Sequence, residues 1–208
     1  MGEHHPHPLG GHMTDLLAGL ASRFGIDPFA SAWRARTLLG LFAFVYGAVS
    51  FAIVGILAAV IHQPLVFPSL GPTAFLSAYR PLAKPSAPRS IVLGHLIGVI
   101  SGYAALFPFG RQHSGSALET GLPAAAVAAA ALSLALTASL MVWLDAPHPP
   151  AAATTLIISL GFLTEPLHFL VLMAAVALLA VQDVFTKRFA GIDGPLWAPL
   201  DEKSPTSP

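Results

Sequence analysis

Four apolar segments, each long enough to cross a bilayer as a helix, dominate this sequence. They lie at residues 37–61, 91–107, 122–144 and 167–185. A membrane-spanning helix needs about 20 mostly apolar residues, and about 17 suffice in some cases. Charged residues make up only 10% of the chain, whereas a soluble domain has about 25%. We therefore expect an all-helical integral membrane protein that contacts the lipid bilayer.

The composition argues against several kinds of chemistry. The chain has no cysteine, so disulfides, thiolate metal sites and iron–sulfur clusters are excluded. Its formal net charge is zero, which argues against a nucleic-acid surface. The His-Glu-x-x-His and Gly-x-Ser-x-Gly motifs of common hydrolases are missing. We expect no cofactor, no metal centre and no enzyme activity.

The two ends of the chain differ from its apolar middle. Segment 13–24 carries Leu16, Leu17, Leu20 and Phe24 on one helical face, which is typical of a helix lying on the membrane surface. A disordered tail that happens to contain leucines is the alternative. The histidine-rich stretch 2–12 suits loose metal binding at most, and the polar tail 201–208 suits disorder. The expected organisation is a cytoplasmic tail at 1–33, a transmembrane domain at 34–188 and a cytoplasmic tail at 189–208.

Two shorter apolar segments, 65–79 and 148–163, lie between the long ones, and each opens with a proline-rich break. The first break reads Pro68-Ser69-Leu70-Gly71-Pro72-Thr73 and the second Pro147-His148-Pro149-Pro150. Proline suits the first turn of a helix because its missing N–H has no helical partner there. We expect a short helix to begin at each break.

The order of segments predicts two similar halves, at about 37–107 and 122–187. Each half has a long helix, a broken short helix and a second long helix. The basic loop 80–89 lies on the cytoplasmic side, as the positive-inside rule requires, only if the short segment before it also crosses. Three crossings per half give opposite orientations, the inverted repeat of many secondary transporters. We expect six crossings in the cell (inner) membrane with both termini cytoplasmic; four spans with two re-entrant loops is the alternative.

A stripe of glycines marks one face of the second long segment. Gly94, Gly98 and Gly102 recur every four residues. This spacing allows another backbone to approach closely. We expect helix packing at this face, either inside the bundle or between copies in a homo-oligomer.

Three motifs resemble the HPP family of integral membrane proteins, which is named for the tripeptide found here at His148-Pro149-Pro150. They are the runs at 68–74, 88–98 and 148–154, and the resemblance covers about 33–188. Members of this family are usually described with four spans, and plant plastid and cyanobacterial relatives are associated with nitrite transport. The resemblance implies small-anion transport. Gly71-Pro72-Thr73 stands where many relatives have a more serine- and alanine-rich run, so the substrate does not follow from it.

An anion also makes physical sense between the two breaks. A short helix presents free backbone N–H groups and the positive end of its dipole to whatever lies before it. Hydroxyl and imidazole donors would add to this attraction, although hydroxyls in membrane helices also back-bond to their own helix. The expected substrate-binding residues are Ser69, Gly71, Pro72, Thr73, His148, Pro149, Pro150, Thr154 and Thr155.

Three further residues are candidates for proton relay or gating. His95, near the start of a span, would relay protons with His148 or form a hydrogen bond near the interface. Asp145 would orient the His148 imidazole. Arg89 would anchor at lipid headgroups or gate anions. A proton that travels with an anion offsets the cost of its charge, about 2.3 kcal/mol per 100 mV of membrane potential.

The sequence thus predicts a transporter of a small inorganic anion, with nitrite as the first guess and proton coupling as an option. A passive anion channel, a structural or sensory membrane subunit, and an intramembrane enzyme built on His95, Asp145 and His148 are the alternatives. A structural subunit would respond to a change of His148 in its assembly, whereas a transporter would respond in its flux.

Overall fold

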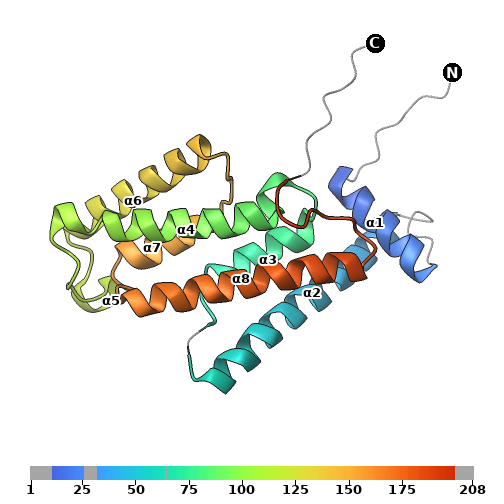
Figure 1. The fold of residues 1–208 in the computed structure, drawn as a ribbon, viewed down its shortest axis with the longest axis horizontal. Coiled ribbons are helices and arrows are strands. Elements are labelled where there is room, and N and C mark those ends of the chain that lie inside the picture. Colours follow the sequence, from blue (N-terminus) through green and yellow to red (C-terminus); the bar gives the residue numbers. More distant parts are fainter. Residues whose placement is uncertain (1–10, 26–31, 64, 200–208) are drawn as a thin grey trace, which may run out of the picture.

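The computed structural model describes residues 11–25, 32–63 and 65–199, and within these ranges every regular element is a helix (Figure 1). Four of the helices are long and apolar enough to cross a membrane. They are α2 (Ala32–Ile61), α4 (Pro88–Ala104), α6 (Ala124–Trp143) and α8 (Pro166–Phe189). The expected all-helical membrane class is therefore confirmed. The expectations for residues 2–10 and 201–208 lie outside the described ranges.

Shorter helices connect and flank the four long ones. The two at the proline-rich breaks are α3 (Leu70–Tyr79) and α7 (Ala151–Ser159). The others are α1 (Gly11–Phe24), α5 (Ala117–Thr120) and the 3₁₀ turns η2 (Lys84–Ser86) and η3 (Phe107–Phe109).

Prolines set where several of these helices begin. Pro88 and Pro166 are the first residues of α4 and α8, where a missing N–H removes no helical hydrogen bond. Pro72 lies in the first turn of α3, as predicted, and Pro150 is the residue just before α7. Gly161, with φ of 82°, follows the end of α7 in a left-handed conformation that favours glycine.

The two short helices begin near the middle of the bundle and run in opposite directions. In Figure 1, α3 runs from the middle toward the end that carries α1, and α7 runs from the middle toward the opposite end. Ten helical residues in α3 rise about 15 Å, roughly half of the hydrocarbon thickness of about 30 Å. Two half-length helices diverging from the middle are compatible with an inverted repeat; the repeat and its six crossings stay predictions.

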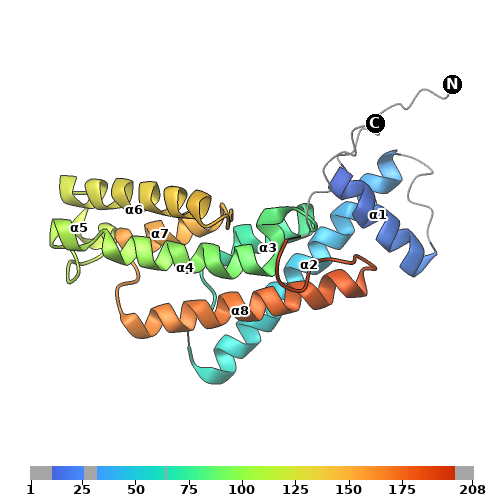
Figure 2. The same ribbon diagram turned by 45° about the horizontal axis from the view of Figure 1, so that its top comes forward.

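Helix α4 lies at the centre of the bundle and contacts α6, α7 and α8 (Figure 2). Its glycine stripe packs against α7 and the residues before it. A Cβ added at Gly94 would lie 2.5 Å from the His148 Cβ, and one at Gly98 would lie 2.8 Å from the Ala151 carbonyl oxygen. At Gly102 the Thr155 carbonyl oxygen would be equally close, at 2.8 Å. The stripe therefore serves packing inside this chain.

Helices α1 and α2 lie at the periphery. The expected helix at 13–24 forms, but Leu16, Leu17 and Leu20 are buried, and Leu16 and Leu20 pack beside Ala190 and Ile192 after α8. Its apolar face therefore lies against the protein and not along the membrane surface. The side chain of Phe24 lies outside the described part. Helix α2 leans away from the bundle in Figure 1 and exposes many of its apolar side chains, as contact with lipid requires.

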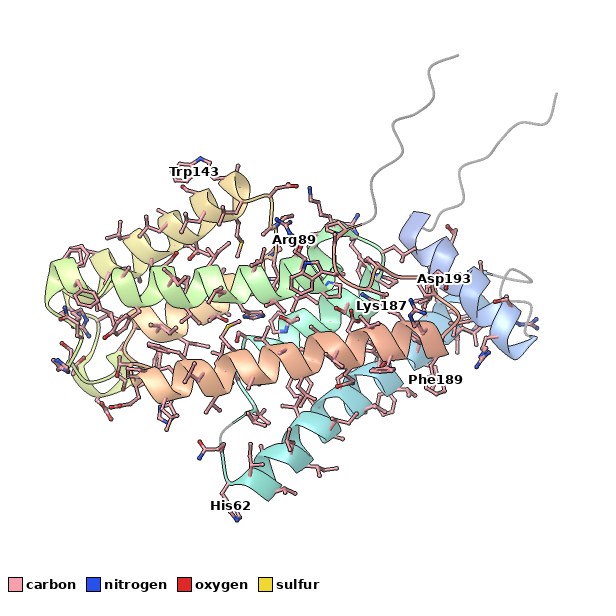
Figure 3. All side chains as sticks on the ribbon, viewed as in Figure 1. His62, Arg89, Trp143, Lys187, Phe189 and Asp193 are labelled. Atoms are coloured by element: carbon pink, nitrogen blue, oxygen red, sulfur yellow. The ribbon has the colours of Figure 1, made fainter. Side chains whose placement is uncertain are left out.

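One end of the bundle carries nearly all of the positive charge. We call it the basic end: it holds α1, the start of α2 and α4, and the end of α3 and α8, with Arg89 and Lys187 visible there in Figure 3. Among the described lysines and arginines, only Arg111 follows η3 at the opposite end, which we call the far end. This distribution is the one that the positive-inside rule expects of a cytoplasmic face.

Candidate functional site

The two proline-rich breaks meet at His95 of α4. Its Nε2 lies 3.0 Å from the Thr73 hydroxyl of α3, and its Nδ1 lies 2.7 Å from the Thr154 hydroxyl of α7. The Thr73 hydroxyl is also 3.1 Å from Nε2 of His148. All four residues are fully buried. The structure thus joins both short helices and α4 through one hydrogen-bonded chain, which we call the His–Thr chain (Thr154, His95, Thr73 and His148).

A backbone carbonyl fixes the direction of the His–Thr chain. Nδ1 of His148 lies 2.7 Å from the Pro85 carbonyl oxygen of η2, and a carbonyl only accepts. His148 Nδ1 therefore carries a hydrogen, and in the neutral ring Nε2 accepts. The Thr73 O–H then donates to His148, His95 Nε2–H donates to Thr73, and the Thr154 O–H donates to His95 Nδ1. Every polar atom of the chain has a partner in this assignment.

The same atoms also accommodate one additional proton. The Thr73 hydroxyl lies 3.1 Å from the Ser69 carbonyl oxygen. If His148 gains a hydrogen on Nε2, that N–H donates to the Thr73 oxygen, and the Thr73 O–H turns to Ser69. The ring centroids of His95 and His148 are 5.0 Å apart, so charge on one ring disfavours charge on the other. The His–Thr chain can therefore hold one proton at a time.

Thr155 belongs to a different contact. Its hydroxyl accepts a 3.0 Å hydrogen bond from Thr137 of α6, and one turn away Ser133 donates to Ser159 at 2.9 Å. These bonds join α6 to α7. Ser133 and Thr137 are four positions apart in an apolar helix, so their spacing in the sequence already indicated a polar face on α6.

The remaining break residues frame the site instead of supplying polar donors. Pro72, Pro149 and Pro150 line a shallow apolar hollow of about 370 Å³ together with Phe75, Leu76 and Ala153. Gly71 faces the ring of Phe51 on α2. The Ser69 hydroxyl is buried and has no hydrogen-bond partner among the described residues. Of the two hydroxyls expected to bind substrate in the first break, it is therefore the one whose O–H is free to donate.

The expected free N–H groups at the start of α7 are occupied. Ala151, Ala152 and Ala153 donate to the carbonyls of His148, Pro149 and Pro150 at 3.0, 3.0 and 3.1 Å. Tight i to i−3 bonds of this kind commonly satisfy the orphan donors of a first helical turn. In this conformation, these three backbone N–H groups at the start of α7 are therefore not available to bind an anion.

Two further hollows lie toward opposite ends of the bundle, and the first of them borders His148. One, of about 400 Å³, lies at the basic end of α6 and is lined by Met141, Asp145, Pro147, His148 and neighbouring residues. The other, of about 530 Å³, lies where α7 ends and α8 begins, with Pro68, Phe162 and His168 in its lining. Between them the two breaks close on each other through hydrogen bonds of 2.7–3.1 Å. The first hollow thus ends at the His–Thr chain, whereas none of its four residues lines the second.

Asp145 and Arg89 have hydrogen-bond partners other than His148. The Asp145 carboxylate does not hold His148; both of its oxygens lie 2.6 Å from the Lys84 ammonium. That hydrogen bond to Lys84 lowers the pKa of Asp145 from its usual value. Arg89 donates to the carbonyls of Leu144 and Asp145 at 3.2 and 3.0 Å. It caps the end of α6, where a cation is favourable.

A second buried polar cluster escaped the sequence analysis. Tyr46 of α2 donates to Asp183 of α8 at 2.6 Å, Asp183 pairs with Lys187, and Gln182 donates to Ser50 at 2.8 Å. The signal was the presence of Gln182, Asp183 and Lys187 within about one and a half turns of an otherwise apolar helix. All three side chains are buried. Across the described ranges, no group of three or more histidine and acidic side chains is arranged to hold a metal ion.

Together these features define a class: a polytopic helical membrane protein whose broken helices meet at a buried, hydrogen-bonded chain of polar side chains. The family model described as HPP, transmembrane region, matches residues 33–191. The chain therefore belongs to the HPP family of membrane proteins. Neither the curated proteins nor the solved structures returned a match.

Proposed function

We propose that this protein carries a small monovalent inorganic anion across the cell membrane, with nitrite as the first candidate and a proton as the coupling ion. The observation that supports this best is the His–Thr chain, because it buries two histidines and two threonines where the broken helices meet, beside a hollow that borders His148. Ionisable and hydrogen-bonding side chains at membrane depth are costly and mark solute or proton pathways. Secondary transporters commonly keep their site where broken helices meet near the midplane.

The anion would bind at the contact between Thr73 and His148. These two groups now bond each other at 3.1 Å, so the conformation is closed to a solute. Separation of α3 from α7 would free the Thr73 O–H, a protonated His148 Nε2–H and the unpartnered Ser69 hydroxyl. Three donors around one protonated ring suit a small monovalent anion.

The capacity of the His–Thr chain for one additional proton supports coupling of anion transport to proton transport. An anion that enters a negative-inside cell works against about 2.3 kcal/mol per 100 mV, and a proton on His148 neutralises that charge. When the anion leaves with the proton, Thr73 can donate to His148 again, and the closed chain re-forms. We also propose that the basic end is cytoplasmic, with both termini on that side.

The test is uptake of nitrite into proteoliposomes that contain the purified protein, with and without an imposed pH gradient. We expect gradient-driven uptake by the wild type. In His148→Ala and His148→Gln the rate of this uptake should fall by at least about tenfold, because groups that transfer protons typically contribute about 10²–10⁴-fold to a rate. The matched control is His113→Ala, because His113 is exposed in the far-end loop.

Each other outcome has a definite meaning. Uptake that ignores the pH gradient in the wild type would identify a passive channel. No flux of nitrite or other small anions, from protein whose helicity and elution volume are normal, would overturn the transport proposal. A His148 variant that changes assembly but not flux would favour a structural subunit.

A further inference from the structure

The buried ion pair of α8 lies outside the His–Thr chain and has no role in the mechanism above. Asp183 and Lys187 are 0% and 2% exposed, and Lys187 Nζ lies 2.5 Å from Asp183 Oδ2. The other carboxylate oxygen accepts the hydroxyl of Tyr46 from α2. Replacing a buried ion pair by apolar side chains of similar volume is often neutral or stabilising. The pair therefore needs an explanation other than stability.

The side chain of Lys187 does not extend to the lipid headgroups, where its charge would be hydrated. A lysine in the last turn of a spanning helix ordinarily extends its ammonium toward the lipid headgroups. Here Nζ turns inward and donates to the Ser86 carbonyl oxygen at 3.0 Å. Gly194, in the segment after α8, packs over the lysine stem, since a Cβ there would lie 3.2 Å from the Lys187 Cδ. Figure 3 places Lys187 on α8 facing the region of Arg89, at the basic end.

The carbonyl that Lys187 binds is the neighbour of the one that binds His148. Pro85 and Ser86 are consecutive residues of η2, a turn of only three residues. The Pro85 carbonyl accepts from His148 Nδ1 at 2.7 Å. Both carbonyls belong to one short turn, which is closed by hydrogen bonds from the Ser86 and Ala87 N–H groups to the Ala83 and Lys84 carbonyls. A displacement of this turn therefore moves both carbonyls together.

The other connections of η2 are weaker. Lys84 pairs with Asp145, but their side chains are 43% and 72% exposed, and exposed pairs contribute little. The Ser86 hydroxyl reaches the Leu76 carbonyl at 3.3 Å, a long contact for a hydroxyl donor. The hydrogen bond from Lys187 to the Ser86 carbonyl is thus the buried, charge-assisted contact that holds this turn.

We propose that Lys187 is a positioning residue for His148: its bond to the Ser86 carbonyl fixes the η2 turn, and the turn fixes the hydrogen on His148 Nδ1. Asp183 and Tyr46 hold the ammonium in place, so a continuous path of buried polar contacts joins α2 to the His–Thr chain. The inference rests on the proposed function in giving His148 a part in transport, but its first measurement does not require transport.

The experiment compares the ring nitrogens of His148 by ¹⁵N NMR in wild-type protein and in Asp183→Asn/Lys187→Met. The double change removes the bond to Ser86, leaves no unpaired buried charge and keeps an acceptor for Tyr46. In the wild type we expect one tautomer, with the hydrogen on Nδ1. In the variant the tautomer ratio should shift about three- to tenfold toward hydrogen on Nε2, as expected when a hydrogen bond of ordinary strength is weakened.

Two controls isolate the effect. Lys84→Met removes the exposed bond to η2 and should leave the tautomer unchanged. Ser159→Ala removes a buried hydrogen bond between α6 and α7 that does not reach η2, so it should also leave the tautomer unchanged. Should the double variant not fold, Tyr46→Phe/Asp183→Leu/Lys187→Met replaces the whole cluster by apolar side chains, and the same comparison is made on it.

Nitrite uptake gives the second readout. The variant should lose its dependence on the pH gradient, whereas Lys84→Met should keep it. The groups around His148 that titrate or carry charge are His95 on α4, Asp145 after α6 and Lys84 on η2, and none of them is changed in the test variant. An unchanged His148 tautomer in folded variant protein would overturn this inference alone, and absence of flux in the wild type would count against the proposed function alone.

Discussion

The hydroxyl of Thr73 has one hydrogen and three partners. It lies within 3.1 Å of His95, of His148 and of the Ser69 carbonyl. A hydroxyl can accept twice and donate once, so it can serve both protonation states of His148 without movement of a heavy atom. Serine at this position would keep that ability, and valine would remove it while keeping the shape.

We expect Thr73→Val to lose pH-driven uptake and to be destabilised by about 1–3 kcal/mol, because imidazole nitrogens are left buried without a partner. Thr73→Ser should keep both properties near the wild-type level. Uptake assays and thermal unfolding in detergent measure the two effects. Normal gradient-driven uptake in folded Thr73→Val would show that protons do not pass through this hydroxyl.

The pair of Lys84 and Asp145 should matter little for stability. Their geometry is close, but both side chains are exposed, and exposed pairs contribute little because water and salt screen them. The lowered pKa of Asp145 means that any stabilisation is present at neutral pH and is lost as the pH falls through that lowered value. Asp145→Asn should therefore leave the midpoint of thermal unfolding at pH 7 close to the wild-type value. A clear loss of stability would point to a structural role of Asp145 that the geometry does not contain.

At the scale of elements, the contact between α4 and α7 sets the site. Gly98 faces the Ala151 carbonyl so closely that a Cβ would lie 2.8 Å from it, and α7 in turn carries Thr154. A methyl group at this face must push α7 and its hydroxyl away from His95. Glycine elsewhere has no such constraint: around Gly47 of α2 nothing lies within 4 Å of an added Cβ.

We expect Gly98→Ala to destabilise the protein by about 1–3 kcal/mol through overpacking and to reduce uptake as the bond from Thr154 to His95 lengthens. Gly47→Ala is the matched control, and it should be neutral or stabilising by up to about 1 kcal/mol because alanine favours the helix. Thermal unfolding of both variants, side by side, measures the difference. Equal stabilities would mean that α7 can move away freely.

At the scale of the whole molecule, the orientation of the bundle can be tested directly, because the chain has no cysteine. The single substitutions Arg80→Cys and Asp193→Cys would each place a cysteine at the basic end, and His113→Cys would place one at the far end. All three positions are exposed. In intact cells a membrane-impermeant maleimide should label the cysteine at 113 and spare the other two. Labelling at 80 but not at 193 would instead put the loop after α3 on the outside and contradict the placement of both at one end.

The class and the frame of the site follow from the sequence because they depend on local pattern. Four long apolar runs suffice for spanning helices, and the prolines at 72, 88, 150 and 166 mark where helices begin, to within a residue or two. The candidate residues Thr73, His95, His148 and Thr154 could also be picked out of the sequence, since polar side chains in an apolar chain stand out, and the structure brings the four together.

The partners of those side chains depend on which segments pack together, and no local pattern carries that information. The sequence by itself determined a helical membrane bundle, broken at two places that hold histidine and threonine. Only the tertiary structure decided that Pro85, and not Asp145, holds His148, that Thr155 turns to α6, and that Lys187 points inward to Ser86. The physical reason is that helix propensity and hydropathy act over neighbouring residues, whereas a hydrogen bond joins whichever donor and acceptor the packing of distant segments brings within about 3 Å.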